Sequence, residues 1–291
     1  MRLTCTSFSF PLLSLEDAAK AIALMRIPLM DLSAYEGWVH IQPHEIEANP
    51  QQQADRVRRA VEEAGLQGLA DMITQFGVSF RDRPINTPDP ATREANRQRF
   101  RAMLTFCKAA GIPGITVLPG VVWEDLGPDR SYELARAELT YMAQLAGDAG
   151  LRLSTEAHRE SVVEPIDRAI QLVHEVPGLR LTLDYTHFVS AGVPVEEVHR
   201  LIPFAAHFHA RQGAPGKLQA DHWEGTLDYP DIVRRLKAAG YQGAITVEYT
   251  WQEWQGCHEL DVLSESILLR DVLLAAIAEG EGPGAATTSP N

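Results

Sequence analysis

A short phrase recurs along this 291-residue chain and restricts its fold more than any other feature. In each copy a helical pattern stops at a glycine, one apolar residue follows, and a β-rich run begins. The copies are EEAGLQGL at 62–69, KAAGIPGITVL at 108–118, GDAGLRLSTE at 147–156 and KAAGYQGAITVE at 237–248. A glycine just past a helix end can take the left-handed conformation that closes the last turn. We therefore expect positive φ at Gly65, Gly111, Gly150 and Gly240.

Strand-like runs alternate with amphipathic helical patterns over the length of the chain. A helical pattern follows each of eight runs, which cover residues 3–10, 29–34, 68–77, 114–120, 151–158, 179–187, 205–212 and 244–250. This alternation predicts parallel βαβ units, and eight such units predict an α/β fold of the closed (β/α)₈ TIM-barrel type. A doubly wound open sheet is the alternative, but no glycine fingerprint follows the first run.

We predict a single barrel domain over residues 1–278, because no linker divides the chain. Residues 279–291 are predicted to be a disordered tail, because they contain no large apolar side chain. The start, MRLTCTSFSFPLL, is predicted to be a first strand and not a secretion signal, since Thr and Ser break its apolar run. No run of about 18 apolar residues occurs, so no membrane span is expected.

Composition argues against several kinds of protein. The formal net charge of −13 disfavours a nucleic-acid binder, whose phosphate contacts need a basic surface. Cys5, Cys107 and Cys257 are widely spaced and odd in number, which favours a reducing cytoplasm over a disulfide framework. We expect a small-molecule partner and neither nucleic acid nor membrane; whether the chain forms a homo-oligomer stays open.

Four successive strand-like runs end in a side chain that can bind a metal ion: Glu156, Asp184, His209 and Glu248. In a parallel barrel such ends meet at the face where catalytic residues lie. Three converging carboxylates without a cation would repel one another and take up protons. We therefore predict one divalent ion bound by these four residues. The donors suit Mn²⁺, Mg²⁺, Co²⁺ or Zn²⁺, of which we expect Mn²⁺.

At these residues the chain resembles the sugar phosphate isomerase/epimerase family, whose members have a xylose-isomerase-like barrel. The resemblance covers nearly the whole chain. It is best in TLDYTH, where Asp184 and His187 stand three apart, and in WEGTLDYPDIVRRLKAAGYQGAITVEY. It implies the same four ligands, places His187 against the substrate, and implies a carbohydrate substrate. The implied activity is isomerisation or epimerisation of a sugar or sugar derivative through a metal-stabilised enediolate.

Such a reaction removes a proton from a carbon beside a carbonyl and returns it elsewhere or on the other face. In related epimerases the two ligand glutamates exchange roles as base and acid, which implies catalytic roles for Glu156 and Glu248. A free-ketose 3-epimerase is disfavoured. Those enzymes carry a Glu six residues after the first ligand, where this chain has Val162, and an Arg six residues after the ligand histidine, where it has Pro215.

His158 stands two residues after Glu156 and therefore faces the same side. In one interpretation it is a general base. Some relatives with a Glu-x-His pattern here act on 3-keto-glycosides, so the alternative function is a metal-dependent lyase or dehydratase of a 3-keto-glycoside or keto-sugar. In the other interpretation His158 is a loop histidine bonded to a backbone carbonyl.

Four more residues each have a functional and a structural interpretation. Arg211, two residues after His209, either binds a phosphate or carboxylate of the substrate or forms a surface salt bridge. His207 is predicted to be a hydrogen-bonded core histidine. Trp123 and Trp251 are candidate walls of a sugar-binding pocket, although packing alone explains most loop tryptophans.

Two other function classes fit the sequence less well. A DNA-repair endonuclease with the same barrel binds three zinc ions and needs histidines on strands one to four and a basic face. Those strands here end in FSF, DLSA, TQFG and LPG. A non-catalytic sugar-sensing barrel is expected to lose one of the four ligands, and this chain keeps all of them.

Overall fold

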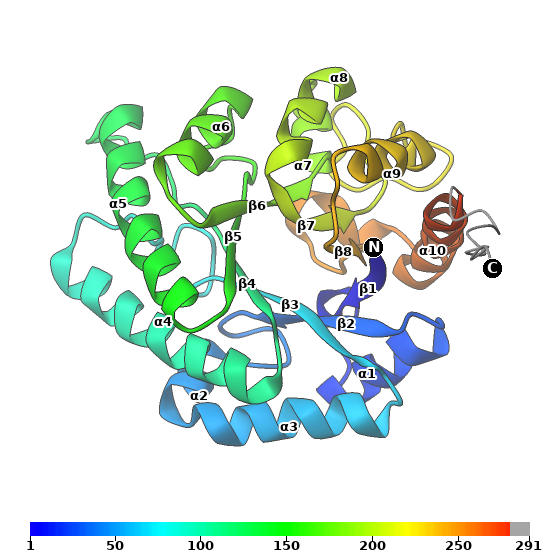
Figure 1. Cartoon of the computed structure of the whole chain (residues 1–291), viewed down its shortest axis with the longest axis horizontal. Coiled ribbons are helices and arrows are strands. Elements are labelled where there is room, and N and C mark those ends of the chain that lie inside the picture. The colour runs from blue at the N-terminus through cyan, green and yellow to red at the C-terminus, as the bar shows by residue number, and fades with distance from the viewer. Residues whose placement is uncertain (280–291) are drawn as a thin grey trace, which may run out of the picture.

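Eight parallel strands close into a barrel in the computed structural model, which describes residues 1–279 (Figure 1). Each strand pairs with the next one in the sequence, and β1 pairs with β8 to close the barrel. The strands are β1 (Arg2–Thr6), β2 (Leu29–Ala34), β3 (Gly68–Thr74), β4 (Gly114–Val117), β5 (Arg152–Glu156), β6 (Leu179–Asp184), β7 (Ala205–Ala210) and β8 (Ala244–Val247). The predicted (β/α)₈ barrel is confirmed.

Helices surround the strands, and at least one α-helix follows each strand (Figure 1). The α-helices are α1 (Leu15–Leu24), α2 (Pro43–Ala48), α3 (Pro50–Glu63), α4 (Pro90–Ala110), α5 (Gly127–Asp148), α6 (Ile166–Glu175), α7 (Thr186–Val189), α8 (Val195–Val198), α9 (Tyr229–Ala238) and α10 (Val262–Ala278). The 3₁₀ helices of the described residues are η1 (Ser7–Ser9), η2 (His199–Phe204) and η3 (Trp254–Glu259). The main hydrophobic core lies between the strands and this ring of helices.

The recurring glycine phrase ends helices as predicted. Gly65, Gly111, Gly150 and Gly240 have φ values of 74°, 76°, 74° and 74°. Gly111 caps the C-terminus of α4, where the left-handed conformation closes the last turn. This geometry returns the chain to the barrel within a few residues, so that the next strand begins at Gly114.

Every strand except β2 ends two to four residues before its sequence pattern does, and at two of them a side chain gives the reason. Residues 7–9 form η1 instead of extending β1, because the Thr6 side chain caps this turn and accepts a hydrogen bond from the Phe8 backbone N–H at 3.2 Å. Helix α7 starts inside the predicted sixth run, where Asp184 accepts a hydrogen bond from the Thr186 backbone N–H at 2.8 Å. In both places a polar side chain at the strand end turns the backbone away from the barrel.

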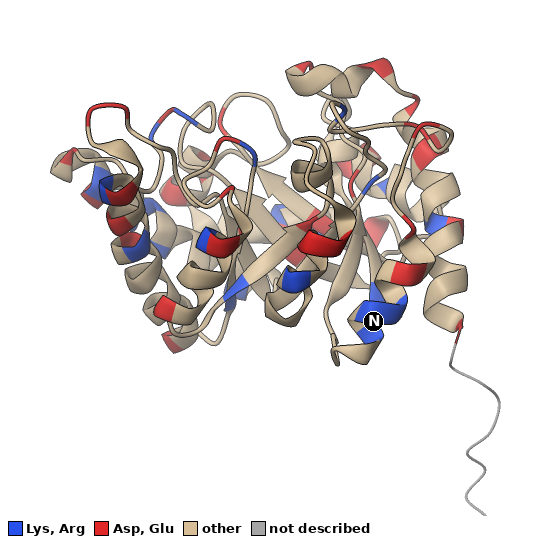
Figure 2. Cartoon of the chain, turned by 90° about the horizontal axis from the view of Figure 1, so that it is seen from above, with Lys and Arg blue, Asp and Glu red and all other residues tan. Residues whose placement is uncertain are grey.

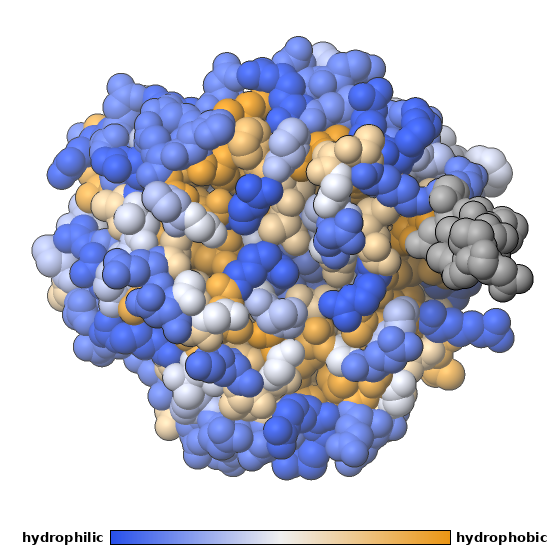
Figure 3. Space-filling model, viewed as in Figure 1, coloured by the Kyte–Doolittle hydropathy of each residue, from blue (hydrophilic) through white to orange (hydrophobic). Residues whose placement is uncertain are grey.

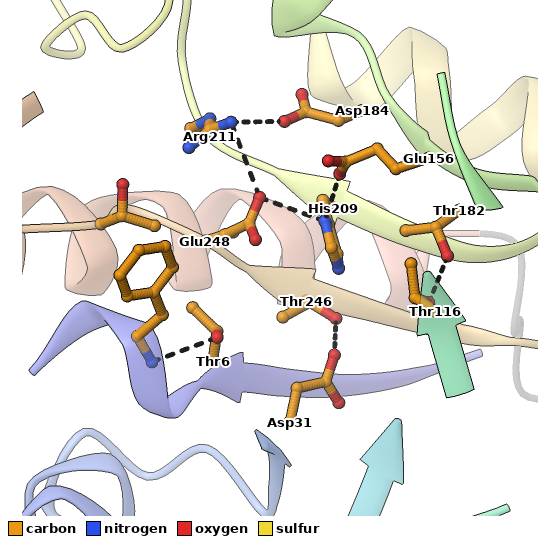
Figure 4. A network of polar contacts seen from close by, with 12 residues as sticks. Thr6, Asp31, Thr116, Glu156, Thr182, Asp184, His209, Arg211, Thr246 and Glu248 are labelled. Atoms are coloured by element: carbon orange, nitrogen blue, oxygen red, sulfur yellow. Dashed lines mark hydrogen bonds and ion pairs between the residues drawn. The ribbon is translucent and has the colours of Figure 1, made fainter. Parts of the chain in front are cut away.

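Polar side chains fill part of the barrel interior (Figure 4). Asp31 Oδ2 lies 2.5 Å from both His207 Nε2 and Thr246 Oγ1. The Thr116 and Thr182 hydroxyls lie 2.6 Å apart. All five side chains are buried. His207 is therefore a hydrogen-bonded core histidine, as predicted.

Charged residues of both signs are spread over the helices and loops (Figure 2). In this view the N-terminus lies low in the picture, and many loops gather along the top. On the face seen in Figure 3, hydrophilic side chains cover the outer ring, and hydrophobic ones are visible between them toward the middle.

No helix within residues 1–279 is long and apolar enough to cross a membrane. The tail predicted for residues 279–291 lies, apart from Glu279, outside the residues that the structure describes. The predicted boundary after residue 278 therefore stays a prediction.

Candidate functional site

The side chains predicted from the four strand ends gather at one end of the barrel (Figure 4). Glu156 and Asp184 are the last residues of β5 and β6, His209 lies in β7, and Glu248 follows β8 directly. All four are buried. Because neighbouring parallel strands lie about 4.8 Å apart, residues at successive strand ends bring their side chains together.

His209 connects the two glutamates. Its Nδ1 lies 2.8 Å from Oε1 of Glu156 and 3.1 Å from Oε2 of Glu248. Burial lowers the pKa of His209, but the attraction of Glu248 and hydrogen bonds to both glutamates outweigh burial and raise this pKa well above its usual value. A ring nitrogen of His209 and one oxygen of each glutamate lie within 4.8 Å of one another. One ion with ligand distances of about 2.0–2.6 Å can span such a group.

Asp184 is held by a different set of donors. Its Oδ1 accepts hydrogen bonds from the backbone N–H and hydroxyl of Thr186, at 2.8 and 2.7 Å. Its Oδ2 accepts one from Arg211 Nη2 at 2.7 Å, and the same nitrogen lies 3.7 Å from Glu248 Oε2. Burial lowers the pKa of Arg211, but Asp184 and Glu248 outweigh burial and raise it.

Arg211 is therefore a buried cation between two carboxylates, with 3% of its surface exposed. Its interpretation as a surface salt bridge is wrong. Arg211 directly follows β7, and its place two residues after His209 continues the alternation that points His209 inward.

His187, in α7, approaches two carboxylates of this group. Its Nε2 lies 3.5 Å from Glu156 Oε2 and 3.6 Å from Asp184 Oδ2. Burial raises the pKa of Glu156, but His187 and His209 outweigh burial and hold this pKa well below its usual range. Glu156 is therefore ionised at neutral pH.

A cavity of about 400 Å³ adjoins these side chains, and Glu156, His187, Arg211 and Glu248 all line it. The structure brings these predicted residues together with His158, which lines the same cavity.

His158 Nδ1 lies 2.6 Å from the backbone carbonyl oxygen of Arg159. A carbonyl only accepts, so Nδ1 donates and Nε2 keeps its lone pair. Burial, followed by the neighbouring His187, lowers the pKa of His158 to about 3, which makes the ring neutral. His158 is thus a histidine bonded to a backbone carbonyl and also a residue of the cavity, so the two interpretations of it are compatible.

The two tryptophans predicted to wall the pocket, Trp123 and Trp251, do not line the cavity, whereas another tryptophan does. Trp123 is not among the residues that line the cavity; its indole N–H donates to the backbone oxygen of Asn86 at 3.0 Å. Trp251 does not line the cavity either. Trp254 does, and its ring stacks on His158 with centroids 5.0 Å apart and planes at 17°. Gly256 is the only sequence sign of the turn that positions this loop.

Sequence reasoning also missed an aromatic group after β1 and β2. Phe8, Tyr35 and Trp38 line the cavity, with ring centroids 5.3 Å apart for Phe8 and Tyr35 and 4.6 Å apart for Phe8 and Trp38. Phe8 was expected within a strand, and the other two lie at or beyond the end of β2, where no periodic pattern marks a residue as facing the cavity.

Known proteins share this sequence pattern and architecture. Residues 33–271 match the family described as xylose isomerase-like TIM barrel. An inosose isomerase from Halalkalibacterium halodurans is 24% identical over 176 residues, which cover 56% of this chain. The matched part spans 62% of that isomerase, so the two chains are not aligned over their full lengths.

Two solved structures have the same fold at low sequence identity. An L-ribulose 3-epimerase superposes with a TM-score of 0.73 and 15% identity, covering 99% of each chain. A xylose isomerase-like TIM barrel protein from Mycobacterium smegmatis, solved in complex with magnesium, superposes with a TM-score of 0.71 and 14% identity, covering 95% of this chain and 98% of that one. The resemblance inferred from the sequence is thus confirmed. Because the family match spans most of the chain, this protein belongs to the xylose isomerase-like TIM barrel family.

Proposed function

We propose that the protein is a divalent-metal-dependent isomerase or epimerase of a sugar or sugar derivative. The observation that carries the proposal is a group of buried carboxylates beside one cavity. His209 contacts Glu156 and Glu248, which line the cavity, and Arg211 joins Asp184 to Glu248. The names of the relatives, an inosose isomerase and an L-ribulose 3-epimerase, support the reaction class.

The charges of this group fit a divalent ion. As a metal ligand His209 would give up the proton that its raised pKa lets it hold, and the three carboxylates with the one guanidinium of Arg211 would then leave a net charge of −2 in a buried site. Uncompensated buried charge is costly, and a divalent ion balances it. Three oxygen donors and one imidazole nitrogen suit such an ion, and the magnesium complex of a related barrel supports the same choice. We propose Glu156, Asp184, His209 and Glu248 as ligands and expect Mn²⁺.

A divalent ion held there would supply positive charge beside the substrate's oxygens, which acidifies the C–H next to the carbonyl. Glu156 and Glu248 both line the cavity. In the proposed reaction a carboxylate oxygen of one glutamate takes the proton from that carbon. For this step the other glutamate must carry a proton, which it gives to the neighbouring carbon or to the other face of the same carbon. His187 and Arg211 would donate hydrogen bonds to substrate oxygens.

Solvent isotope exchange tests this proposal. The protein is incubated with Mn²⁺ in D₂O with free, phosphorylated and 3-keto sugars, and NMR follows deuterium at the carbon beside the carbonyl. We expect exchange with at least one sugar, its loss on chelation, and a rate about 10²–10⁴-fold lower in Glu248→Gln. Glu138→Gln is the matched control, because Glu138 is as buried as Glu248, at 4% exposure, and pairs with Arg97 outside the cavity.

Exchange that survives chelation would refute the metal-dependent reaction. Exchange at the wild-type rate in Glu248→Gln would refute the role of the glutamate pair. The location proposed with this function is the cytoplasm, because Cys5, Cys107 and Cys257 are all buried free thiols.

The position of His158 favours a second candidate function, a lyase or dehydratase acting on a 3-keto-glycoside or keto-sugar. Its ring lines the cavity, and the bond from Nδ1 to the Arg159 carbonyl leaves Nε2 with the lone pair that can accept a proton. In this reaction Nε2 removes the proton beside the ketone and the electrons of that C–H bond form a C=C bond. The β-substituent then leaves with its bonding electron pair and takes up a proton, as water or an alcohol.

His158→Ala separates the two candidates. A histidine base predicts a chemical step that is about 10²–10⁴-fold slower at full metal content. A glutamate pair predicts a modest change, because both carboxylates remain. Single-turnover kinetics with elemental analysis measures both quantities, and a rate within a fewfold of wild type would remove His158 from the chemistry.

A further inference from the structure

Most of the cavity is lined by side chains that the proposed chemistry does not use. Eight of its lining residues are apolar or aromatic. The neutral polar residues that line it are Gln75, Ser79, Thr250 and Gln252. Gln252 Nε2 already donates to the Thr250 hydroxyl at 3.1 Å. A free sugar carries hydroxyl groups around its whole ring, and each buried hydroxyl needs a hydrogen-bond partner. Beyond the carboxylates, arginines and histidines of the cavity, these four residues are the neutral non-aromatic side-chain partners that the lining offers.

One part of this lining is the aromatic group of Phe8, Tyr35 and Trp38. The Tyr35 and Trp38 rings lie nearly parallel, at 17°, with centroids 5.8 Å apart. Phe8 meets Trp38 edge-on at 70°. Phe8 and Tyr35 are buried, whereas Trp38 is 37% exposed at the cavity. Packed edges of this kind hold the rings in place, so the group presents a stiff apolar wall.

A second aromatic group consists of Phe80, His158 and Trp254. The centroid of the His158 ring lies 4.9 Å from that of Phe80 and 5.0 Å from that of Trp254. These residues come from the loops after β3, β5 and β8. The group therefore joins three segments that are distant in the sequence at one side of the candidate base.

The loops that carry this second group hold strained backbone. Gln255, next to Trp254, has φ of 58°, and Glu160, two residues after His158, has φ of 65°. Left-handed backbone costs a non-glycine residue about 1–2 kcal/mol. Such strain is concentrated at sites where geometry serves function.

The cationic groups of the cavity are already paired with carboxylates. Arg81 lies 3.0 Å from Glu160, and both line the cavity. Arg211 is paired with Asp184 and lies near Glu248. A phosphate would have to displace these pairs and would lie close to three carboxylates. The described lining therefore suits an uncharged ligand better than a phosphorylated one.

We propose that the substrate is an unphosphorylated sugar bearing a flat apolar or aromatic substituent. The substituent would pack against Trp38 and Trp254, and the sugar would lie beside Glu156 and Glu248. This inference rests on the proposed function, because it takes the cavity to be the sugar site. It goes beyond that proposal in naming the non-reacting half of the substrate.

Binding of non-reacting ligands to the Mn²⁺-loaded protein tests the inference. Titration calorimetry compares 4-nitrophenyl glycosides of glucose, galactose and xylose with the matching methyl glycosides and with glucose 6-phosphate. Burial of an added aryl ring should tighten binding by roughly 10–100-fold. Trp38→Ala and Trp254→Ala should each remove most of this gain. Trp223→Ala is the matched control, because Trp223 is 84% exposed and does not line the cavity. It should leave the gain unchanged.

Aryl glycosides that bind no tighter than methyl glycosides, or no binding of any aryl glycoside, would overturn the inference. Tighter binding of glucose 6-phosphate than of every aryl glycoside would also overturn it. If aryl glycosides still bind more tightly than methyl glycosides in both Trp38→Ala and Trp254→Ala, the substituent binds elsewhere, and the proposed roles of the two tryptophans are refuted. These binding results do not test the proposed function. The proposed function is refuted by a different result, namely that no sugar undergoes metal-dependent proton exchange.

Discussion

Replacing Arg211 with methionine should strongly destabilise the metal-free protein. The guanidinium is 3% exposed, bonds Asp184 at 2.7 Å and Thr186 at 3.1 Å, and lies 3.7 Å from Glu248. Methionine removes the charge and leaves buried carboxylates without their cation. Breaking a buried ion pair by removing one partner costs about 3–5 kcal/mol. For a chain of this size each kcal/mol lowers Tm by about 2 °C, so we expect a loss of roughly 6–10 °C.

Thermal melting in chelator and in Mn²⁺ measures this effect. In chelator, Arg211→Met should melt well below wild type, and Mn²⁺ should restore part of the loss by neutralising the same carboxylates. Arg234→Met is the control, because Arg234 is 72% exposed and pairs with Asp231 at the surface, where ion pairs contribute about 0–1 kcal/mol. A variant that melts within about 2 °C of wild type in chelator would refute the electrostatic account of the site.

Two further predictions concern folding. Asp31→Asn should cost about 3–5 kcal/mol in denaturant unfolding at neutral pH, because it breaks the buried pair with His207. Burial raises the pKa of Asp31, but His207 outweighs burial and lowers it. The difference in unfolding free energy between wild type and Asp31→Asn should therefore shrink as the pH falls below about 4. A difference that stays constant with pH would contradict this reasoning. Gly111→Ala should cost roughly 1–2 kcal/mol because its φ is 76°. Gly147→Ala, inside α5 with open space at its Cβ, should instead stabilise by about 0.5–1 kcal/mol, and equal effects of the two changes would refute the capping account.

The sequence was informative wherever a regular pattern decides the structure. Alternation of strands and helices predicted the barrel, and the glycine phrase predicted four helix ends. The placing of Glu156 and Asp184 at one end of the barrel could be predicted because each ends an apolar run, and parallel strands bring such ends to one edge. His209 was identifiable by its place in the next run, two residues beyond a second histidine of the same face.

What the sequence did not reveal depends on loops and on the reach of long side chains. Alternation put Arg211 on the face of His209, but it could not tell that the guanidinium reaches Asp184 on the neighbouring strand. Nothing periodic distinguishes Trp254 from Trp251, since a turn with φ of 58° at Gln255 shapes their loop. Trp123 was predicted to form a wall of the sugar pocket. Its indole N–H instead donates to the Asn86 backbone oxygen, and Trp123 is not among the residues that line the cavity.

Counting metal ions tests the central claim most directly. Chelator-treated protein is dialysed to equilibrium against Mn²⁺, and elemental analysis gives the ions bound per chain. The account predicts one ion per wild-type chain and its loss when Glu156, Asp184, His209 or Glu248 is replaced by alanine in a chain that circular dichroism shows to be folded. His222→Ala, which removes a histidine paired with Glu265 outside the cavity, should keep the ion. A wild-type chain that binds no ion, or full binding in any of the four alanine variants, would contradict the account.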